Sequence, residues 1–229
     1  MKRLAVLASL SMATVATIPA ALAGMVNTPV EAGGSFSVPV KSLRESRFGS
    51  TIRQQFDFSC GSAALSTLLT HHYGHPVREE DVFAAMFERG DKNKIRREGF
   101  SLLDMKNYLE AHGFKADGFR TDLDQLAISG IPAIVLIKEN GYNHFVVVKG
   151  FKDGRVLIGD PSAGTRAMPR RQFESIWQDQ VLFVVHNRRE VAQFNKSSDW
   201  RVAPRAPVAA NAHGNTTDVL LFRPSARDF

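Results

Sequence analysis

Apolar residues in the first half of the chain recur with the spacing of α-helices. After Cys60, four of them fall on one face of a helix that ends before Gly74: Ala64, Leu65, Leu68 and Leu69. The same spacing predicts three more helices, over residues 77–90, 101–113 and 123–129. Ser101 is a typical N-cap residue, and Gly113 is a typical stop, for the second of these three helices.

After Gly130 the pattern changes to runs of β-branched and apolar residues, which predict β-strands. Strands are predicted at 132–137, 144–151 and 155–160, followed by a short helix at 169–177 and a last strand at 180–186. Turns at Gly141 and at Asp153-Gly154 join neighbouring strands into antiparallel hairpins. Helices first and an antiparallel sheet afterwards predict an α+β fold, with the N-terminal helices packed on the sheet.

The first 23 residues have the pattern of a cleaved signal peptide. Lys2 and Arg3 precede a short apolar run, and the small residues at 21–23 form a cleavage site that leaves Gly24 as the mature N-terminus. A retained membrane anchor is the alternative, but Pro19 breaks the run, which is shorter than the ~20 residues that span a bilayer. The pattern therefore predicts export to the periplasm, with no membrane-spanning segment in the mature protein.

The rest of the chain divides into three regions by its patterning. Residues 24–49 form an N-terminal extension with one edge strand at 35–43, and residues 50–186 are long enough for one domain with its own core. Residues 187–229 form a basic tail that is predicted to be mostly extended. Within the tail, residues 218–222 are apolar enough to dock as a strand.

By itself, the formal net charge of +6 excludes few classes of function. Much of the excess lies in a predicted loop at 91–99 and in arginines from Arg166 onward. Because no run of aromatic residues interleaved with lysines accompanies these charges, a nucleic-acid groove is not predicted.

Cys60 is the only cysteine of the chain, and it lies where the first long helix begins. In an exported protein an unpaired cysteine is a candidate reactive thiol, because the oxidising compartment normally pairs cysteines. A helix N-terminus stabilises a thiolate and points free backbone N–H groups at whatever binds in front of the sulfur. The alternative is a buried cysteine that serves only as a small apolar side chain.

One of the seven histidines is placed differently from the others. His144 opens a strand directly after a turn, and Asp160 ends the adjacent antiparallel strand, so the two should be neighbours. A carboxylate there would orient the imidazole, although an Asp-Pro pair is also a common turn. His71 and His75 have the i, i+4 spacing of metal ligands, but no third ligand follows, so neither a metal nor another cofactor is expected.

Four segments taken together resemble the C39 family of cysteine peptidases: QQFDFSCGSAALSTLL (54–69), GFSLLDMKNYLEAHGF (99–114), HFVVVKGF (144–151) and GDPSAG (159–164). The resemblance covers the predicted domain and implies a papain-like fold. At the matching positions it implies Cys60 as nucleophile, His144 as general base and acid, and Asp160 as the residue that orients the histidine. Gln54 matches the glutamine of the oxyanion hole, with its neighbour Gln55 as the alternative.

The chain departs from many family members in two ways. Ser59 precedes the cysteine where many transporter-fused members have Asp, and no transmembrane or nucleotide-binding region follows. The chain resembles the stand-alone exported branch, most closely the members that accompany the Fap functional-amyloid secretion system. This implies a periplasmic cysteine endopeptidase whose partners are a peptide or protein substrate, secreted amyloid subunits and the outer-membrane secretion machinery. The alternative is a binding module that holds cargo for the secretion system, and acyl transfer to an amine is an alternative to hydrolysis.

Overall fold

The computed structural model describes residues 25–30 and 34–203 of the chain. The predicted signal peptide and the predicted strand at 218–222 lie outside these residues. The chain divides into two units between Ser42 and Leu43. Among the described residues, the helices are too short or too polar to cross a membrane.

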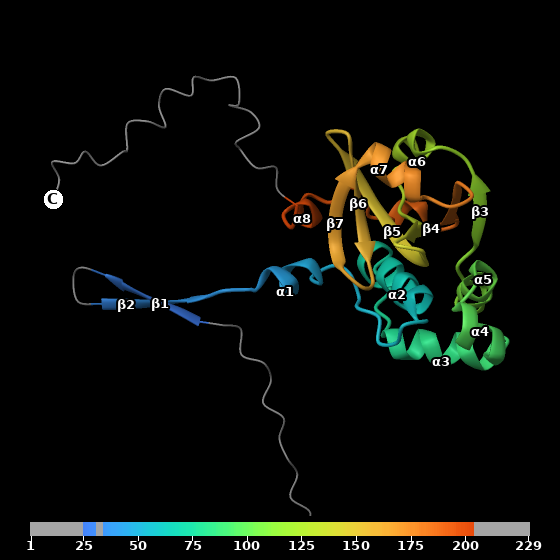
Figure 1. Ribbon diagram of the computed structural model, residues 1–229, viewed down its shortest axis with the longest axis horizontal. Helices are drawn as coiled ribbons and strands as arrows, with labels where there is room; N and C mark the ends of the chain where they lie inside the picture. Colours follow the sequence, from blue (N-terminus) through green and yellow to red (C-terminus); the bar gives the residue numbers. More distant parts are fainter. Residues whose placement is uncertain (1–24, 31–33, 204–229) are drawn as a thin grey trace, which may run out of the picture. The chain divides into compact units, whose positions relative to one another are not determined.

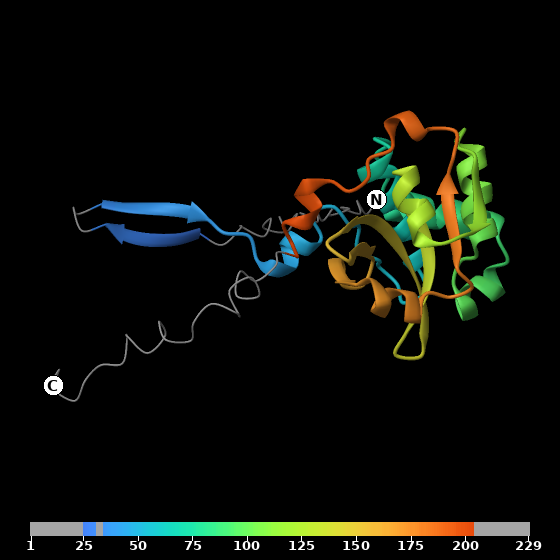
Figure 2. The same cartoon turned by 90° about the horizontal axis from the view of Figure 1, so that it is seen from above.

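The first unit contains an antiparallel hairpin of two strands, β1 (Met25–Val30) and β2 (Gly34–Pro39), which Figure 2 shows face-on. β2 covers most of the edge strand that the sequence predicts at 35–43, and its partner is β1. The sequence pattern does not predict β1.

The second unit combines the predicted helices with others that the pattern misses. Its helices, in chain order, are α1 (Leu43–Arg47), α2 (Cys60–His72), α3 (Glu79–Arg89), α4 (Lys92–Glu98), α5 (Leu102–Ala111), α6 (Leu123–Ser129), α7 (Arg170–Ile176), the 3₁₀ turn η1 (Arg189–Val191) and α8 (Ser197–Trp200). The predicted helices correspond to α2, α3, α5, α6 and α7. The predicted loop at 91–99 is wrong, because Asp91 caps α4 by accepting hydrogen bonds from the backbone N–H groups of Asn93 and Lys94, both at 3.0 Å.

The strands of the second unit form one antiparallel sheet of six strands. They are β3 (Ala116–Arg120), β4 (Ala133–Glu139), β5 (Tyr142–Lys152), β6 (Arg155–Asp160), β7 (Gly164–Pro169) and β8 (Val181–Val185), in the order β3-β8-β4-β5-β6-β7. The predicted strands correspond to β4, β5, β6 and β8, and the α+β class is confirmed. The two edge strands were not predicted, because neither β3 nor β7 contains an apolar run.

The sheet carries a hydrophobic core on each face, with α2, α3 and α5 against one face and α6 and α7 against the other (Figure 1). β5 divides its side chains between them: Phe145 and Val147 belong to the core of α2, and Val146 and Val148 to the core of α6 and α7. Because both faces are covered, this strand is continuously apolar where a half-exposed strand would alternate.

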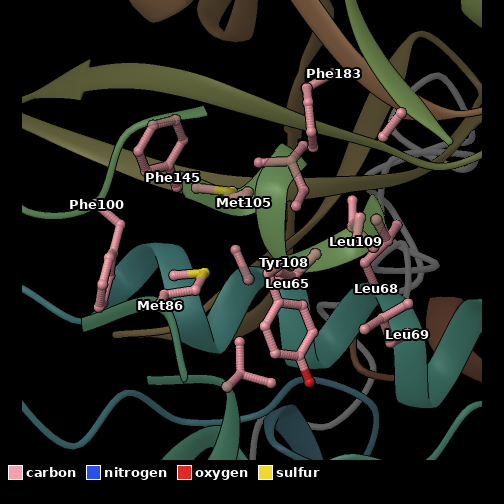
Figure 3. Close-up of a cluster of buried hydrophobic side chains, with 14 of the residues drawn as sticks. Leu65, Leu68, Leu69, Met86, Phe100, Met105, Tyr108, Leu109, Phe145 and Phe183 are labelled. Atoms are coloured by element: carbon pink, nitrogen blue, oxygen red, sulfur yellow. The ribbon is translucent and has the colours of Figure 1, made fainter. Parts of the chain in front are cut away.

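α2 is the central helix of the first core, where Leu65 and Leu68 lie among side chains from the sheet and from α5 (Figure 3). Its first turn is packed closely as well. A Cβ atom at Gly61 would lie 3.0 Å from Met105 Cε and 3.0 Å from Phe100 Cβ, closer than ordinary contacts allow. The glycine after Cys60 therefore lets α5 and the preceding loop approach the start of α2, which fixes the position of the cysteine.

Candidate active site

Cys60 is the first residue of α2 and is 9% exposed. In the described part of the chain, the preceding Ser59 makes no capping bond to α2 with its side chain. Instead its hydroxyl accepts a hydrogen bond from Phe56 N and donates one to Phe56 O, both at 3.1 Å. Ser59 thus holds the turn in front of Cys60 in place and leaves the first-turn N–H groups of α2 without a side-chain cap.

A buried carboxyl group lies behind the same turn of the helix. Ser62 Oγ donates a hydrogen bond of 2.6 Å to Glu79 Oε1, and Glu79 is 3% exposed. Burial raises the pKa of the Glu79 carboxyl, and hydrogen bonds from Ser62 and Ser59 act against that rise. The sequence pattern places Glu79 among surface acids at the start of a helix, so it gives no signal of this burial.

His144 and Asp160 are in contact at the ends of neighbouring strands. β5 carries the histidine and β6 the aspartate, and the antiparallel pairing of Val147 with Gly159 brings these ends together. The distance from His144 Nε2 to Asp160 Oδ1 is 2.7 Å. The Cys60 side chain is close enough to His144 to act on the pKa of the imidazole. Because Nε2 is engaged by Asp160, Nδ1 is the ring nitrogen that remains for the thiol.

The Asp160 carboxylate is surrounded by donors besides the histidine. It accepts hydrogen bonds from Ser162 N at 2.9 Å and Ser162 Oγ at 2.7 Å, and from Arg166 Nη2 at 3.0 Å. Arg166 also contacts Glu139 at 2.6 Å, so the arginine joins two carboxylates. Sequence reasoning missed Arg166 because the strand that carries it, β7, was not predicted.

His144 and Asp160 each stabilise the charged form of the other. Burial alone would lower the pKa of His144, but hydrogen bonds and charge from Asp160 and Cys60 outweigh it and raise the pKa to about 9. Burial alone would raise the pKa of Asp160, but His144 and Ser162 hold it well below its ordinary value. The imidazole is therefore protonated at neutral pH, with the Asp160 carboxylate on one side and the Cys60 sulfur nearby.

The two candidate oxyanion-hole glutamines, Gln54 and Gln55, have different hydrogen-bond partners. Gln54 N donates to Pro161 O at 3.0 Å, next to Asp160, and Gln54 Nε2 donates to Phe56 O at 3.1 Å. Its Oε1 is buried and has no hydrogen-bond partner among the described residues. Gln55 is exposed and hydrogen-bonds Glu80. Gln54 is thus tied to the turn that carries Asp160, and its amide has a second N–H group free to donate.

A cleft of about 580 Å³ opens beside His144. Its lining is polar and partly acidic: Asp57, Glu139, Asn140, Tyr142, Asn143, His144, Asp160 and Ser162. In the turn before Cys60, Phe56 is half exposed and packs against Phe58 and Phe83, with ring centroids 5.9 and 5.2 Å away. Because the next residue, Asp57, lines the cleft, this exposed aromatic side chain adjoins the cleft lining in the chain.

The pair of histidines with metal-ligand spacing has other surroundings. The His75 ring packs on Phe114 with 5.4 Å between the centroids, and His71 lies at the end of α2. No three His, Cys, Asp or Glu side chains gather as a metal site within the described residues.

A thiol, an imidazole, an orienting carboxylate and an amide donor are the groups that acyl transfer through a cysteine uses. The chain belongs to the Peptidase C39 family, whose model matches residues 50–189. It is 41% identical over 153 residues to the probable functional amyloid protease FapD of Pseudomonas aeruginosa, an alignment that covers 67% of this chain and 68% of that protein.

Two solved peptidase domains resemble the fold. The peptidase domain of Streptococcus ComA, a bifunctional ABC transporter, has a TM-score of 0.50 and 21% identity, over 60% of this chain and 98% of that domain. A double glycine motif protease from an AMS/PCAT transporter, solved with a leader peptide, has a TM-score of 0.50 and 27% identity, over 58% of this chain and 88% of the other. These neighbours confirm the fold that the sequence predicts.

Proposed function

We propose that this protein is a periplasmic cysteine endopeptidase that processes, or supports the export of, a secreted protein of the amyloid type. The contact of His144 with both Asp160 and Cys60 carries the chemical part of the proposal. The identity to a probable functional amyloid protease supports the biological part. The signal-peptide pattern of the first 23 residues supports the periplasm.

The first half of the reaction makes an acyl-enzyme. The Cys60 thiolate forms a bond to the carbonyl carbon of the scissile peptide, and the oxygen takes up the displaced electron pair. The Gln54 amide and the Cys60 backbone N–H donate to this oxyanion. His144 then gives its proton to the leaving nitrogen, the C–N bond breaks, and the amine product departs.

The second half returns the enzyme to its starting state. His144, now neutral, takes a proton from a water molecule whose oxygen bonds to the thioester carbon. The C–S bond breaks, the acid product leaves, and the thiolate reforms beside the imidazolium. Throughout, Asp160 holds the Nε2 side of the ring, so that Nδ1 stays directed at the reacting atoms.

The proposed substrate is an extended peptide segment. The structural neighbour that was solved with a leader peptide supports this choice, and so does the open cleft of about 580 Å³ beside His144. A double glycine is a reasonable first sequence to offer, because that neighbour is a double glycine motif protease.

The test compares the mature chain with its Cys60→Ala variant on peptides prepared from a periplasmic extract and on one synthetic double-glycine leader peptide. New peptide ends are identified by mass spectrometry. We expect new ends with the wild type and none with the variant, while circular dichroism shows both to be folded. New ends at equal rates from both proteins would rule out the mechanism. A folded wild type that cleaves nothing and whose thiol reacts like a free cysteine would favour the cargo-binding alternative.

A further inference from the structure

A lysine lies completely buried in the middle of the strand that carries His144. Lys149 is 0% exposed and sits at a bulge in the pairing of β5 with β6. Its Nζ donates to Ser50 O at 2.8 Å, to Ser50 Oγ at 2.7 Å and to Thr165 Oγ1 at 3.3 Å. Asp199 Oδ2 lies 3.0 Å away and balances its charge. Ser50 and Asp199 thus meet at the same buried ammonium group.

The partner of Lys149 comes from outside the part of the chain that matches the family model. That match ends at residue 189, and Asp199 lies on α8. The segment before α8 is docked by further polar contacts: Asn195 N donates to Lys149 O at 2.7 Å, and Gln193 O lies 2.6 Å from Nδ1 of the buried His72. Trp200 Nε1 donates to Asn195 Oδ1 at 2.8 Å. The segment is therefore an integral part of the second unit.

Ser50 begins the short stretch that ends at Gln54. Three of its residues are hydrogen-bonded to other parts of the second unit: Thr51 Oγ1 with Thr165 Oγ1 of β7 at 2.7 Å, Ile52 N with Thr67 Oγ1 of α2 at 2.8 Å, and Gln54 N with Pro161 O at 3.0 Å. The stretch thus spans from the buried lysine to the turn beside Asp160.

We propose that the buried pair of Lys149 and Asp199 is a positioning device that sets the place of Gln54, the donor to the oxyanion. The proposal rests on the proposed function. A buried ion pair contributes little net stability compared with apolar residues of the same volume. Its directional bonds, in contrast, fix where Ser50 lies, and only three residues separate Ser50 from Gln54. Lys149 and Asp199 act through that segment and touch no reacting atom.

The test uses two reagents that differ in their need for an oxyanion donor. With p-nitrophenyl acetate, Cys60 Sγ bonds to the acetyl carbon and p-nitrophenolate leaves, through a tetrahedral oxyanion. With iodoacetamide, Sγ displaces iodide and no oxyanion forms. The ratio of acetylation rate to alkylation rate therefore reports on the donor, and loss of folded protein lowers both rates together.

The principal variant is the double substitution Lys149→Met with Asp199→Leu, which fills the site without a charge. We expect its acetylation rate to fall at least about tenfold, because misplacement by ~1 Å costs on the order of 10²-fold, while its alkylation rate stays within about twofold of wild type. If the double variant does not fold by circular dichroism, Asp199→Asn replaces it and the same ratio is measured. Arg155→Met is the matched control, since Arg155 donates to Ala203 O of the same segment at 3.0 Å, and among the described residues no hydrogen bond or ion pair joins it to Ser50. It should leave the ratio unchanged.

The decisive comparison repeats the double substitution in a Gln54→Ala background. If Lys149 and Asp199 act through Gln54, the double substitution should lower the acetylation rate by less than about threefold in the Gln54→Ala background, because the effects of coupled residues are not additive. An equal loss in both backgrounds, or an unchanged ratio in the double variant, overturns the inference alone. A wild-type thiol that is acetylated no faster than free cysteine overturns the proposed function and this inference with it.

Discussion

At the scale of single residues, the imidazole of His144 is the group on which the chemistry depends. It lies between Asp160, at 2.7 Å, and the thiol of Cys60. These two neighbours raise its pKa to about 9 against the effect of burial. The raised pKa means that the ring is protonated at neutral pH, and a protonated ring stabilises a thiolate beside it.

His144→Ala should therefore remove the reactivity of Cys60 at acidic pH. An ordinary thiol is only a few per cent ionised at pH 7. We expect alkylation by iodoacetamide at pH 6 to slow by about tenfold or more in the variant. His112→Ala is the control, because His112 bonds Tyr108 O at 2.7 Å at the end of α5. Equal rates for wild type and His144→Ala would mean that the two groups do not form a pair.

Asp160→Asn should move the alkaline limit of the reaction. Since the carboxylate raises the pKa of His144, removing its charge lowers that pKa from about 9. The protonated imidazole, which must give a proton to the leaving group, is then lost at a lower pH. The alkaline limb of the rate of peptide cleavage, in which the leaving amine needs that proton, should shift to lower pH in the variant. A limb that stays in place would show that Asp160 does not control the charge of His144.

Sequence reasoning placed His144 beside Asp160 because strand pairing is a local rule: the start of one strand meets the end of the next. It did not reveal Arg166, Glu79 or the buried head of Lys149. The lysine was visible inside the run HFVVVKGF, but an apolar run does not show which polar side chain is enclosed. Such burial depends on segments far away in the chain, here on Asp199.

At the scale of elements, the start of α2 is held by close packing. Gly61 lies against Met105 and Phe100, and a side chain there would be 3.0 Å from each. The elements that carry the site, α2, β5 and β6, were all predicted, because each has a long apolar face or run. β3 and β7 were missed because edge strands need fewer apolar residues, and α4 was missed because a single buried residue, Ile95, supports it.

Gly61→Ala should push α2 away from α5. Overpacking of this kind costs about 1–3 kcal/mol in the free energy of unfolding. Because Cys60 is the adjacent residue, we also expect slower acetylation of the folded variant. Urea unfolding and the acetylation rate check the two effects. A variant with wild-type stability would show that Met105 moves aside without cost.

At the scale of the whole molecule, the working unit is longer than the family match. The match ends at residue 189, but the described fold continues to residue 203 through contacts with Lys149 and His72. The pattern predicted an extended tail after residue 186, because this part of the chain has few apolar clusters. Its docking combines polar bonds with isolated apolar contacts, such as Phe194 on Phe151 and the buried Trp200, which form no periodic pattern that the sequence would reveal.

A chain that ends at residue 189 should be less stable than one that ends at residue 203. Without Asp199 the Lys149 ammonium is buried and unpaired, a loss of about 3–5 kcal/mol in the free energy of unfolding. Thermal and urea unfolding of the two truncated chains provide the measurement. Equal stability would show that residues 190–203 are not an integral part of the second unit.

The position of Asp199 also sets an order of events during biosynthesis. A chain that emerges N-terminus first contains Cys60, His144 and Asp160 before residue 199 has been made. Among the described residues, Asp199 is the carboxylate that pairs with Lys149, so the donor side of the candidate site is completed last. Under the proposed mechanism, a nascent chain holds its candidate nucleophile and base before this pair exists, and full turnover begins after synthesis has passed residue 199.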